Sequence, residues 1–147
     1  MIRESAARFA EQRLAPNSRK WEAAGAVEPE VLREMGELGF MGMTVPEKYG
    51  GAGLDYVSYA LALMEIAAGD GAVSTIMSVN NAPVCAILQS VASEPLRETY
   101  LKPLAAGQMI GAFALTEPQA GSDAANVQTR AVRTAAGYEI TGTKQFI

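Results

Sequence analysis

The chain contains no histidine, and its 147 residues include a single cysteine, Cys85. Without histidine, neither a Ser-His-Asp nor a Cys-His catalytic arrangement can form within the chain. Because the common zinc sites are built from several His and Cys ligands, we expect no metal site of that kind. One cysteine cannot form an internal disulfide and is typical of a reducing compartment, so we expect a cytoplasmic protein. A general base in this chain would have to be a carboxylate or a lysine.

Charge and long apolar runs are also scarce. Charged residues make up 19% of the chain, and its formal net charge is −4. Phosphate binding needs a basic surface, so this balance argues against nucleic acid as the main partner. No window has the length and character of an apolar transmembrane helix, and the first residues do not resemble a signal peptide, so we expect no membrane span. Hydrophobic residues reach 49%, enough for the core of one ordinary globular domain.

Apolar residues recur at helical spacing over the first two thirds of the chain, and prolines, glycines and capping residues bound each pattern. We expect helices over residues 2–14, 29–38, 56–68, 73–91 and 94–104. The boundary residues are Pro16, Gly39, Asp55, Ser93 and Gly107. Three glycines and a proline predict a loop between the second and third helices, at Thr44–Leu54.

The helix expected over residues 56–68 is apolar over a wide arc, which indicates deep burial. The residues of this arc are Ala60, Leu61, Leu63, Met64 and Ala67.

The segment 73–91 is the most apolar of the chain, and Asn80, Asn81 and Pro83 interrupt it. A proline inside a helix removes a hydrogen bond, so we expect a kink or a break near Pro83. Cys85 is interpreted as a small buried hydrophobe. The segment is too apolar to face water on all sides, so we expect the isolated chain to expose a broad apolar face there.

The spacing changes from helical to alternating near Gly111. Ile110–Leu115 is a candidate strand, and Val127–Thr134 and Tyr138–Thr141 are typical of a hairpin with a turn at Ala135–Gly137. We therefore expect a helical domain over residues 1–110 and a strand-rich part over 111–147. Because two or three strands do not make a stable sheet alone, we expect this part to be the beginning of a larger β domain.

The stretch Thr116-Glu-Pro-Gln-Ala-Gly-Ser-Asp123 is a turn-rich loop that leaves a candidate strand. Such a loop directs backbone N–H groups and hydroxyls outward, which is what the polar edge of a flavin ring needs when negative charge collects there. Gly121 allows the backbone to pass close to a ligand. The alternative is a polar turn in which Pro118, Gly121 and Ser122 only shape the chain.

Four segments in the same order resemble the acyl-CoA dehydrogenases: Val45–Leu54, Met77–Asn81, Phe113–Asp123 and Gly142–Ile147. The resemblance covers nearly the whole chain, and Met77–Asn81 is similar to the short-chain members. It implies a mainly α fold, in which an N-terminal helical bundle is followed by the first strands of a β-barrel domain. It also implies FAD-dependent oxidation of acyl-CoA thioesters to 2-enoyl-CoA, an electron-transfer flavoprotein or similar acceptor, and a homo-oligomer.

The resemblance also assigns site residues. It implies that FAD contacts Phe113, Leu115, Thr116, Gly121, Ser122, Phe146 and Ile147. Ser122 would also meet the pantetheine arm of the substrate, and Phe146 would pack on the flavin face away from it. The alternatives are purely structural roles. Phe113, Leu115 and Phe146 would be core residues, and the Ser122 hydroxyl would bond its own backbone.

No residue of the chain is expected to act as the catalytic base. In most members of the family a glutamate in a C-terminal helical domain removes the α proton, and Glu117 lies in the flavin loop instead. We therefore expect the isolated chain to have negligible activity. The resemblance leaves open a dehydrogenase or an oxidase. A different class is a non-catalytic helical fragment or self-association module without flavin.

We also expect a short acyl pocket. The segment Thr75–Asn81 resembles the short-chain members in the helix that forms the floor of the acyl cavity in the family, and bulky Ile76 and Met77 would shorten the acyl tunnel if they point into it. The alternative is that both side chains face neighbouring helices.

Overall fold

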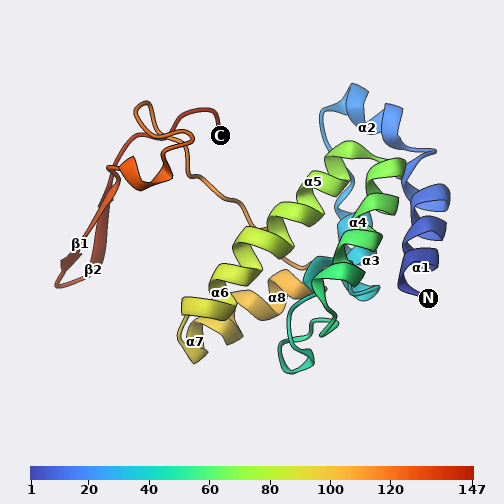
Figure 1. Ribbon diagram of the computed structural model, residues 1–147, viewed down its shortest axis with the longest axis horizontal. Helices are drawn as coiled ribbons and strands as arrows, with labels where there is room; N and C mark the ends of the chain where they lie inside the picture. Colours follow the sequence, from blue (N-terminus) through green and yellow to red (C-terminus); the bar gives the residue numbers. More distant parts are fainter. The chain divides into compact units, whose positions relative to one another are not determined.

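The computed structural model describes all residues from Met1 to Ile147, and the chain divides into two compact units, Met1–Ala112 and Phe113–Ile147 (Figure 1). The first unit is almost entirely helical, and the second contains one small antiparallel sheet. The fold is therefore mainly α with the first strands of a β part, as the sequence predicts. The two units are described separately below.

The helical unit contains eight α-helices and five turns of π- or 3₁₀-helix. The α-helices are α1 (Ile2–Phe9), α2 (Ser18–Ala24), α3 (Pro29–Glu37), α4 (Tyr56–Gly69), α5 (Gly71–Val79), α6 (Ala86–Val91), α7 (Glu94–Leu96) and α8 (Lys102–Ala105). The π-helical turns are η1 (Ala10–Leu14), η4 (Asn80–Cys85) and η5 (Arg97–Leu101), and the 3₁₀ turns are η2 (Phe40–Gly42) and η3 (Glu47–Tyr49). All five predicted helices are present, and Asp55 caps α4 as expected, by accepting a hydrogen bond from the Ser58 N–H at 2.7 Å.

The larger hydrophobic core is formed by the first five helices, with α4 packed between α1 and α5 (Figure 1). Phe9 on α1 contacts Phe40 with ring centroids 5.9 Å apart, and both side chains are buried. Met77 on α5 belongs to this core and is fully buried, and Ile76 packs against it. The idea that the Met77 side chain shortens an acyl tunnel is therefore wrong, because this side chain faces neighbouring helices.

A smaller core joins the Thr44–Leu54 loop to the last helices of the unit. It contains Tyr49, Cys85 and Leu101, and Tyr49 Oη also donates to the Glu94 carboxylate at 2.7 Å. Burial raises the pKa of the Cys85 thiol to about 12, so the thiol is neutral and unreactive at ordinary pH. The interpretation of Cys85 as a small buried hydrophobe is confirmed.

Two glycines allow α3 and the end of α8 to touch. A Cβ atom at Gly36 would lie 2.1 Å from the Ala106 carbonyl oxygen, and one at Gly107 would lie 2.5 Å from the Leu32 carbonyl oxygen. Gly107 also has a φ of +68°, in the left-handed region that favours glycine and ends helices. No larger residue fits at either position without moving the backbone.

The apolar segment 71–91 is one helix rather than two. It runs through α5, η4 and α6, and the wider π-helical turn at Asn80–Cys85 contains Pro83. A proline cannot donate a backbone hydrogen bond, and a π-turn is a common local adjustment where the regular helical ladder is interrupted. The chain is therefore not broken at Pro83, and the interruption appears as a change of helix type.

The same helix has 21 residues, and its most apolar window has a mean hydropathy of 1.3, so by length and composition it could cross a membrane. The expectation that no segment reaches this length and character was wrong. A core helix of a water-soluble domain passes the same test, and here 28% of the window is buried within the chain.

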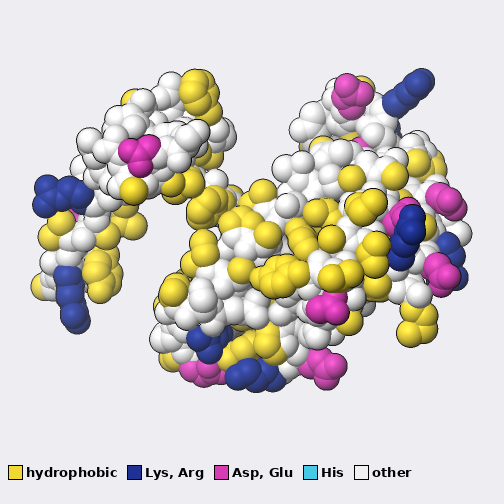
Figure 2. Space-filling view, viewed as in Figure 1, with side chains coloured by type: hydrophobic (Ala, Val, Ile, Leu, Met, Phe, Trp, Pro, Cys, Tyr) yellow, Lys and Arg dark blue, Asp and Glu magenta, His cyan; other side chains and the backbone are white.

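Helix α4 is less buried than its composition indicates. Ala60, Met64 and Ala67 are exposed, while the residues that face the core are Tyr59, Ala62 and Ile66. Two further large side chains, Tyr56 and Val57, are exposed at the start of the helix. The prediction that the whole arc is deeply buried was therefore wrong. The apolar arc is wider than the face of α4 that packs against the core, so part of the arc is exposed to solvent. Figure 2 shows apolar side chains gathered on the surface of the helical unit.

Asn81 connects the long helix to the segment that follows α3. Its side-chain Nδ2 donates to the carbonyl oxygens of Phe40 (2.8 Å) and Met77 (3.0 Å), and its Oδ1 accepts from the Met43 N–H at 2.7 Å. The side chain is 1% exposed. All these bonds lie in the interior, where an unpaired amide would be costly.

Asn80, the preceding residue of the same helix, is bonded to three other segments. Its Nδ2 donates to the carbonyl oxygens of Met41 (2.8 Å) and Leu104 (3.2 Å), and its Oδ1 accepts from the Gly111 N–H at 2.9 Å. The two asparagines therefore join η2, α8 and the end of the helical unit to one helix.

The second unit contains a single hairpin, formed by β1 (Arg130–Thr134) and β2 (Gly137–Thr141), after a short 3₁₀ turn, η6 (Ala124–Asn126). The strands are antiparallel, with Arg130 opposite Thr141 and Thr134 opposite Gly137. The predicted hairpin is confirmed, but the strand expected over 110–115 is absent. No other segment pairs with that stretch, and a strand needs a hydrogen-bonding partner. Every residue of β1 and β2 is exposed.

We predict that Asn81→Ala lowers the free energy of unfolding of the helical unit by about 2–4 kcal/mol, because it leaves the Met43 N–H and the Phe40 carbonyl buried without partners. Urea unfolding followed by far-UV circular dichroism measures this loss. The control is Gln89→Ala, which removes an amide side chain of the same long helix that makes no hydrogen bond in the structure. Equal midpoints for the two variants would show that the buried amide is dispensable.

Candidate functional site

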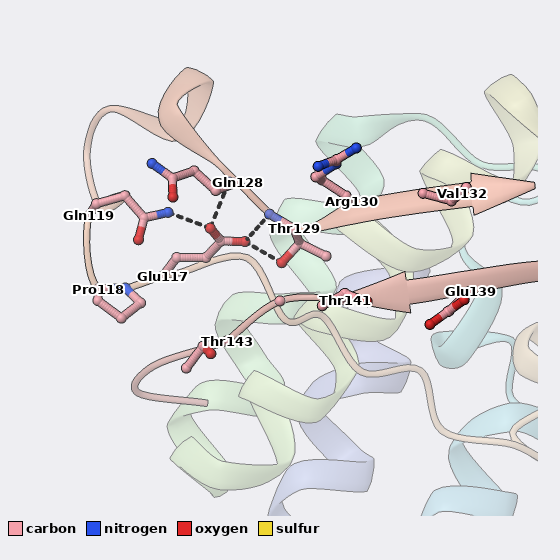
Figure 3. A pocket seen from close by; sticks show the side chains of 11 residues that line it. Glu117, Pro118, Gln119, Gln128, Thr129, Arg130, Val132, Glu139, Thr141 and Thr143 are labelled. Carbon is pink, nitrogen blue, oxygen red and sulfur yellow. Dashed lines mark hydrogen bonds between the residues drawn. The ribbon is translucent and has the colours of Figure 1, made fainter.

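Glu117 is the only charged residue buried in the second unit, with 3% of its surface exposed. Its carboxylate accepts hydrogen bonds from the backbone N–H groups of Gln128 (2.7 Å) and Thr129 (3.0 Å) and from the Thr129 hydroxyl. The Nε2 of Gln119 donates at 2.5 Å and the Nζ of Lys144 at 2.9 Å. Figure 3 shows three of these partners, Gln119, Gln128 and Thr129, around the carboxylate.

These donors hold the pKa of Glu117 well below its ordinary value of 4.5. The Thr129 hydroxyl has the largest effect, followed by the Gln128 N–H and Lys144, and together they outweigh burial, which raises the pKa. Glu117 is therefore charged, with its oxygens occupied by donors of the protein. Such a group is poorly suited to accept a proton from a substrate.

The two motif segments of the sequence meet beside this carboxylate. The Gln145 N–H donates to the Thr116 carbonyl oxygen at 2.9 Å, and Lys144 Nζ donates to the Leu115 carbonyl oxygen at 3.0 Å. A third link is the ion pair of Lys144 with Glu117. Segments that are about 29 positions apart in the sequence therefore lie side by side, with Lys144 bonded to both ends of the Leu115–Glu117 stretch.

The predicted contact residues on these segments carry exposed apolar surface. Exposed fractions are 44% for Phe113, 38% for Leu115, 89% for Phe146 and 73% for Ile147. None of these side chains belongs to a hydrophobic core within the chain. Thr116 is half-buried at the point where its segment meets the second one. Phe146 has a φ of +56°, a left-handed conformation that is uncommon for an aromatic residue.

Gly121 and Ser122 are exposed and lie on the turn after Glu117. A Cβ atom at Gly121 would meet nothing within 4 Å, so the space beside it is open. The Ser122 hydroxyl makes no hydrogen bond to the backbone, which contradicts the alternative that it only bonds its own turn.

A hollow of about 670 Å³ lies on the other side of Glu117, between the turn and one face of the hairpin (Figure 3). Its lining residues are Glu117, Pro118, Gln119, Gln128, Thr129, Arg130, Val132, Glu139, Thr141, Gly142 and Thr143. None of the seven predicted contact residues lines it. The hollow is open, and its lining includes Gln119, Gln128 and Thr129, which are bonded to the Glu117 carboxylate.

Sequence reasoning missed the partners of Glu117. Thr129 and Gln128 were interpreted only as members of an alternating strand, and Lys144 only as part of a motif. A charged residue in each of two separate motifs, one acidic and one basic, was the available signal for an ion pair. Across the whole chain, no group of three or more His, Cys, Asp or Glu side chains is placed to hold a metal ion.

Comparison with known proteins decides the family. The family model described as the acyl-CoA dehydrogenase N-terminal domain matches residues 1–108, and the model of the middle domain of the same enzymes matches residues 112–147. The chain belongs to the acyl-CoA dehydrogenase family. The two motif segments that meet beside Glu117 both lie in the part that matches the middle domain.

Individual relatives agree with this assignment. The chain is 38% identical over all its 147 residues to the probable acyl-CoA dehydrogenase YngJ of Bacillus subtilis, covering 39% of that protein. It is 37% identical over its full length to the mitochondrial short-chain specific acyl-CoA dehydrogenase of Rattus norvegicus, covering 36% of it. A glutaryl-CoA dehydrogenase from Mycobacterium smegmatis, solved in complex with FADH2, has a TM-score of 0.90 and 38% identity over 97% of this chain and 37% of that one.

We predict that the stability of the hydrogen-bonded contacts around Glu117 depends on pH. A carboxyl with a lowered pKa in the folded state contributes stability that is fully present above its unfolded pKa and is lost progressively as the pH falls from there through the lower folded pKa. The amides of Gln128 and Thr129 should therefore be fully protected from hydrogen exchange at about pH 6 and lose protection gradually as the pH falls from about 4.5 toward the much lower folded pKa of Glu117. Exchange measured by NMR and corrected for intrinsic rates tests this.

The internal control for that experiment is the set of amides within α5, which share no group with Glu117. They should keep their protection over the range in which the hairpin amides lose theirs. Protection of Gln128 and Thr129 that stays unchanged from about pH 6 down to about pH 2 would contradict the prediction.

Proposed function

We propose that the protein carrying this sequence is an FAD-dependent acyl-CoA dehydrogenase that oxidises acyl-CoA thioesters to 2-enoyl-CoA. The chain spans 36–39% of the length of the relatives named above, so the activity proposed is that of a protein of their length. The observation that carries the proposal is the meeting of the two motif segments at Thr116 and Gln145, which brings their exposed apolar side chains to one part of the second unit.

The residues present fit part of a flavin site. A flavin ring is flat and apolar on its faces and polar at one edge. Exposed Phe113, Leu115 and Phe146 offer uncovered apolar surface, Thr116 offers a hydroxyl, and the space beside Gly121 is open to a close approach. The M. smegmatis relative is described with the reduced form of this cofactor. When bound, FAD supplies the acceptor for the hydride that leaves the β carbon.

The roles of this chain would be binding and orientation rather than proton transfer. Backbone N–H groups of the Thr116–Asp123 loop would stabilise charge at the polar edge of the cofactor, and Ser122 would also bond the pantetheine arm. The proton acceptor would come from outside residues 1–147, because Glu117 is fully occupied by its own donors. We further propose a cytoplasmic homo-oligomer that passes its electrons to an electron-transfer flavoprotein or a similar acceptor.

One observation favours a second candidate. Tyr56, Val57 and Met64 form an exposed apolar surface on α4, and such surfaces drive association. The alternative function is therefore a helical self-association module without flavin. A colourless full-length protein that takes up no FAD but sediments as an oligomer would favour it, whereas a yellow protein with a flavin spectrum favours the dehydrogenase.

We predict that the full-length gene product contains flavin and reduces a dye when an acyl-CoA is added, with butyryl-, octanoyl- and palmitoyl-CoA compared as substrates. In that protein Ser122→Ala should lower kcat/KM about three- to tenfold, mainly by raising KM, because one hydrogen bond to the substrate arm is lost. Ser90→Ala, which removes an exposed hydroxyl of α6, is the matched control. A flavin-free protein, or equal kinetics for the two variants, would argue against the proposal.

We predict that the 147-residue chain alone gives no measurable acyl-CoA-dependent dye reduction even with added FAD, because removing a member of a catalytic unit costs many orders of magnitude. The assay needs the full-length enzyme as a positive control at the same concentration. Turnover by the isolated chain above the rate with FAD alone would mean that it contains a base we have not identified.

A further inference from the structure

The second unit is held together by polar contacts rather than by a hydrophobic core. Among residues 113–147, only Glu117 and Ala120 are buried, and both hydrophobic cores of the chain lie entirely within residues 1–112. A hairpin without an apolar core is at best marginally stable in water. The two motif segments are held against each other by the hydrogen bonds of Lys144 and Gln145 with Leu115, Thr116 and Glu117.

We propose that Glu117 is a positioning residue of the cofactor site: through Lys144, its carboxylate holds the segment Gly142–Ile147 against Leu115 and Thr116, so that both segments face one cofactor. The inference rests on the proposed function, because it assigns a role to Glu117 within the same site. Glu117 itself touches neither cofactor nor substrate in this account.

The contacts form a chain from Glu117 to the predicted site. Lys144 Nζ lies 2.9 Å from the Glu117 carboxylate and 3.0 Å from the Leu115 carbonyl oxygen, so one ammonium group bridges both. The next residue, Gln145, is bonded through its backbone to Thr116. Phe146 follows directly. Phe113, Leu115, Phe146 and Ile147 are therefore each at most three residues from Leu115 or Lys144, which the Lys144 ammonium group joins to Glu117.

The remaining hydrogen bonds of the Glu117 carboxylate fix the start of the hairpin. The N–H groups of Gln128 and Thr129 lead directly into β1, which begins at Arg130. The carboxylate therefore connects three pieces of chain: its own turn, the start of the hairpin and the segment after the hairpin. Bonds to a charged acceptor are stronger than those between neutral groups, which suits one residue with several partners.

A glutamine at position 117 would have the same shape but not the same bonding. One oxygen would become an NH₂ group, which is a donor facing other donors. Such a substitution loses the ion pair with Lys144 and leaves at least one N–H or hydroxyl without an acceptor. The helical unit contains none of these groups, so its helices serve as an internal control for folding.

The test uses the full-length gene product, stripped of flavin and titrated with FAD while flavin fluorescence is followed. We expect Glu117→Gln and Lys144→Met each to weaken FAD binding about tenfold or more, because each removes charge-assisted hydrogen bonds. Lys144→Arg, which keeps the positive charge, should restore most of the affinity. Glu139→Gln is the matched control, since Glu139 is an exposed carboxylate that lines the same hollow and makes no hydrogen bond.

The visible absorption spectrum of the bound flavin provides a readout that a purely structural role would not change. We expect the flavin bands to shift in Glu117→Gln and in Lys144→Met but not in Glu139→Gln, while the helical circular dichroism signal stays the same in all of them. If Glu117→Gln does not fold, the comparison of Lys144→Met with Lys144→Arg decides.

Two results would overturn the inference and can be told apart. A wild-type protein that binds FAD, with Glu117→Gln and Lys144→Met binding it equally well and with the same spectrum, would remove the positioning role alone. A wild-type protein that takes up no FAD would remove the proposed function, and this inference with it.

Discussion

The buried carboxylate of Glu117 is the constraint on which the second unit depends. It is nearly inaccessible, it accepts hydrogen bonds from four residues, and it lies where a small domain would usually have an apolar core. A buried charge is costly unless it is fully paired, and here the backbone donors and Lys144 provide the pairing. Lys144 also brings together the two motif segments, both of which lie in the part that matches the family's middle domain.

The helical unit also contains buried polar side chains that need hydrogen-bond partners, but these are neutral. Asn80 and Asn81 are buried in a long apolar helix, and their amides are bonded to backbone atoms of η2, Met43, α5, α8 and Gly111. The apolar cores supply most of the stabilisation in this unit, and the asparagines select which segments lie against the helix. Polar residues inside the chain therefore fix geometry in both units, although only one unit also has a hydrophobic core.

Periodicity and capping residues predicted the helices and the hairpin because these depend on local sequence. Asp55 caps α4, and Gly39 and Gly107 have the positive φ with which helices commonly end. The strand expected over 110–115 failed because a strand depends on a distant partner, and the exposed side of α4 was missed because composition does not say how wide the packed face is. The family motifs indicated candidate contact residues, but the pairing of Glu117 with Lys144 and Thr129 depends on folding and is not apparent from any single segment.

The central claim is that Glu117, acting through Lys144, holds Gln145 against Thr116. The most direct test is a double-mutant cycle with Glu117→Gln and Lys144→Met, in which hydrogen exchange of the Gln145 amide is measured by NMR. The account predicts that each single variant deprotects this amide and that the double variant is no less protected than either, because both act on one contact. A Gln145 amide as protected in the variants as in the wild type, or effects that simply add, would contradict it.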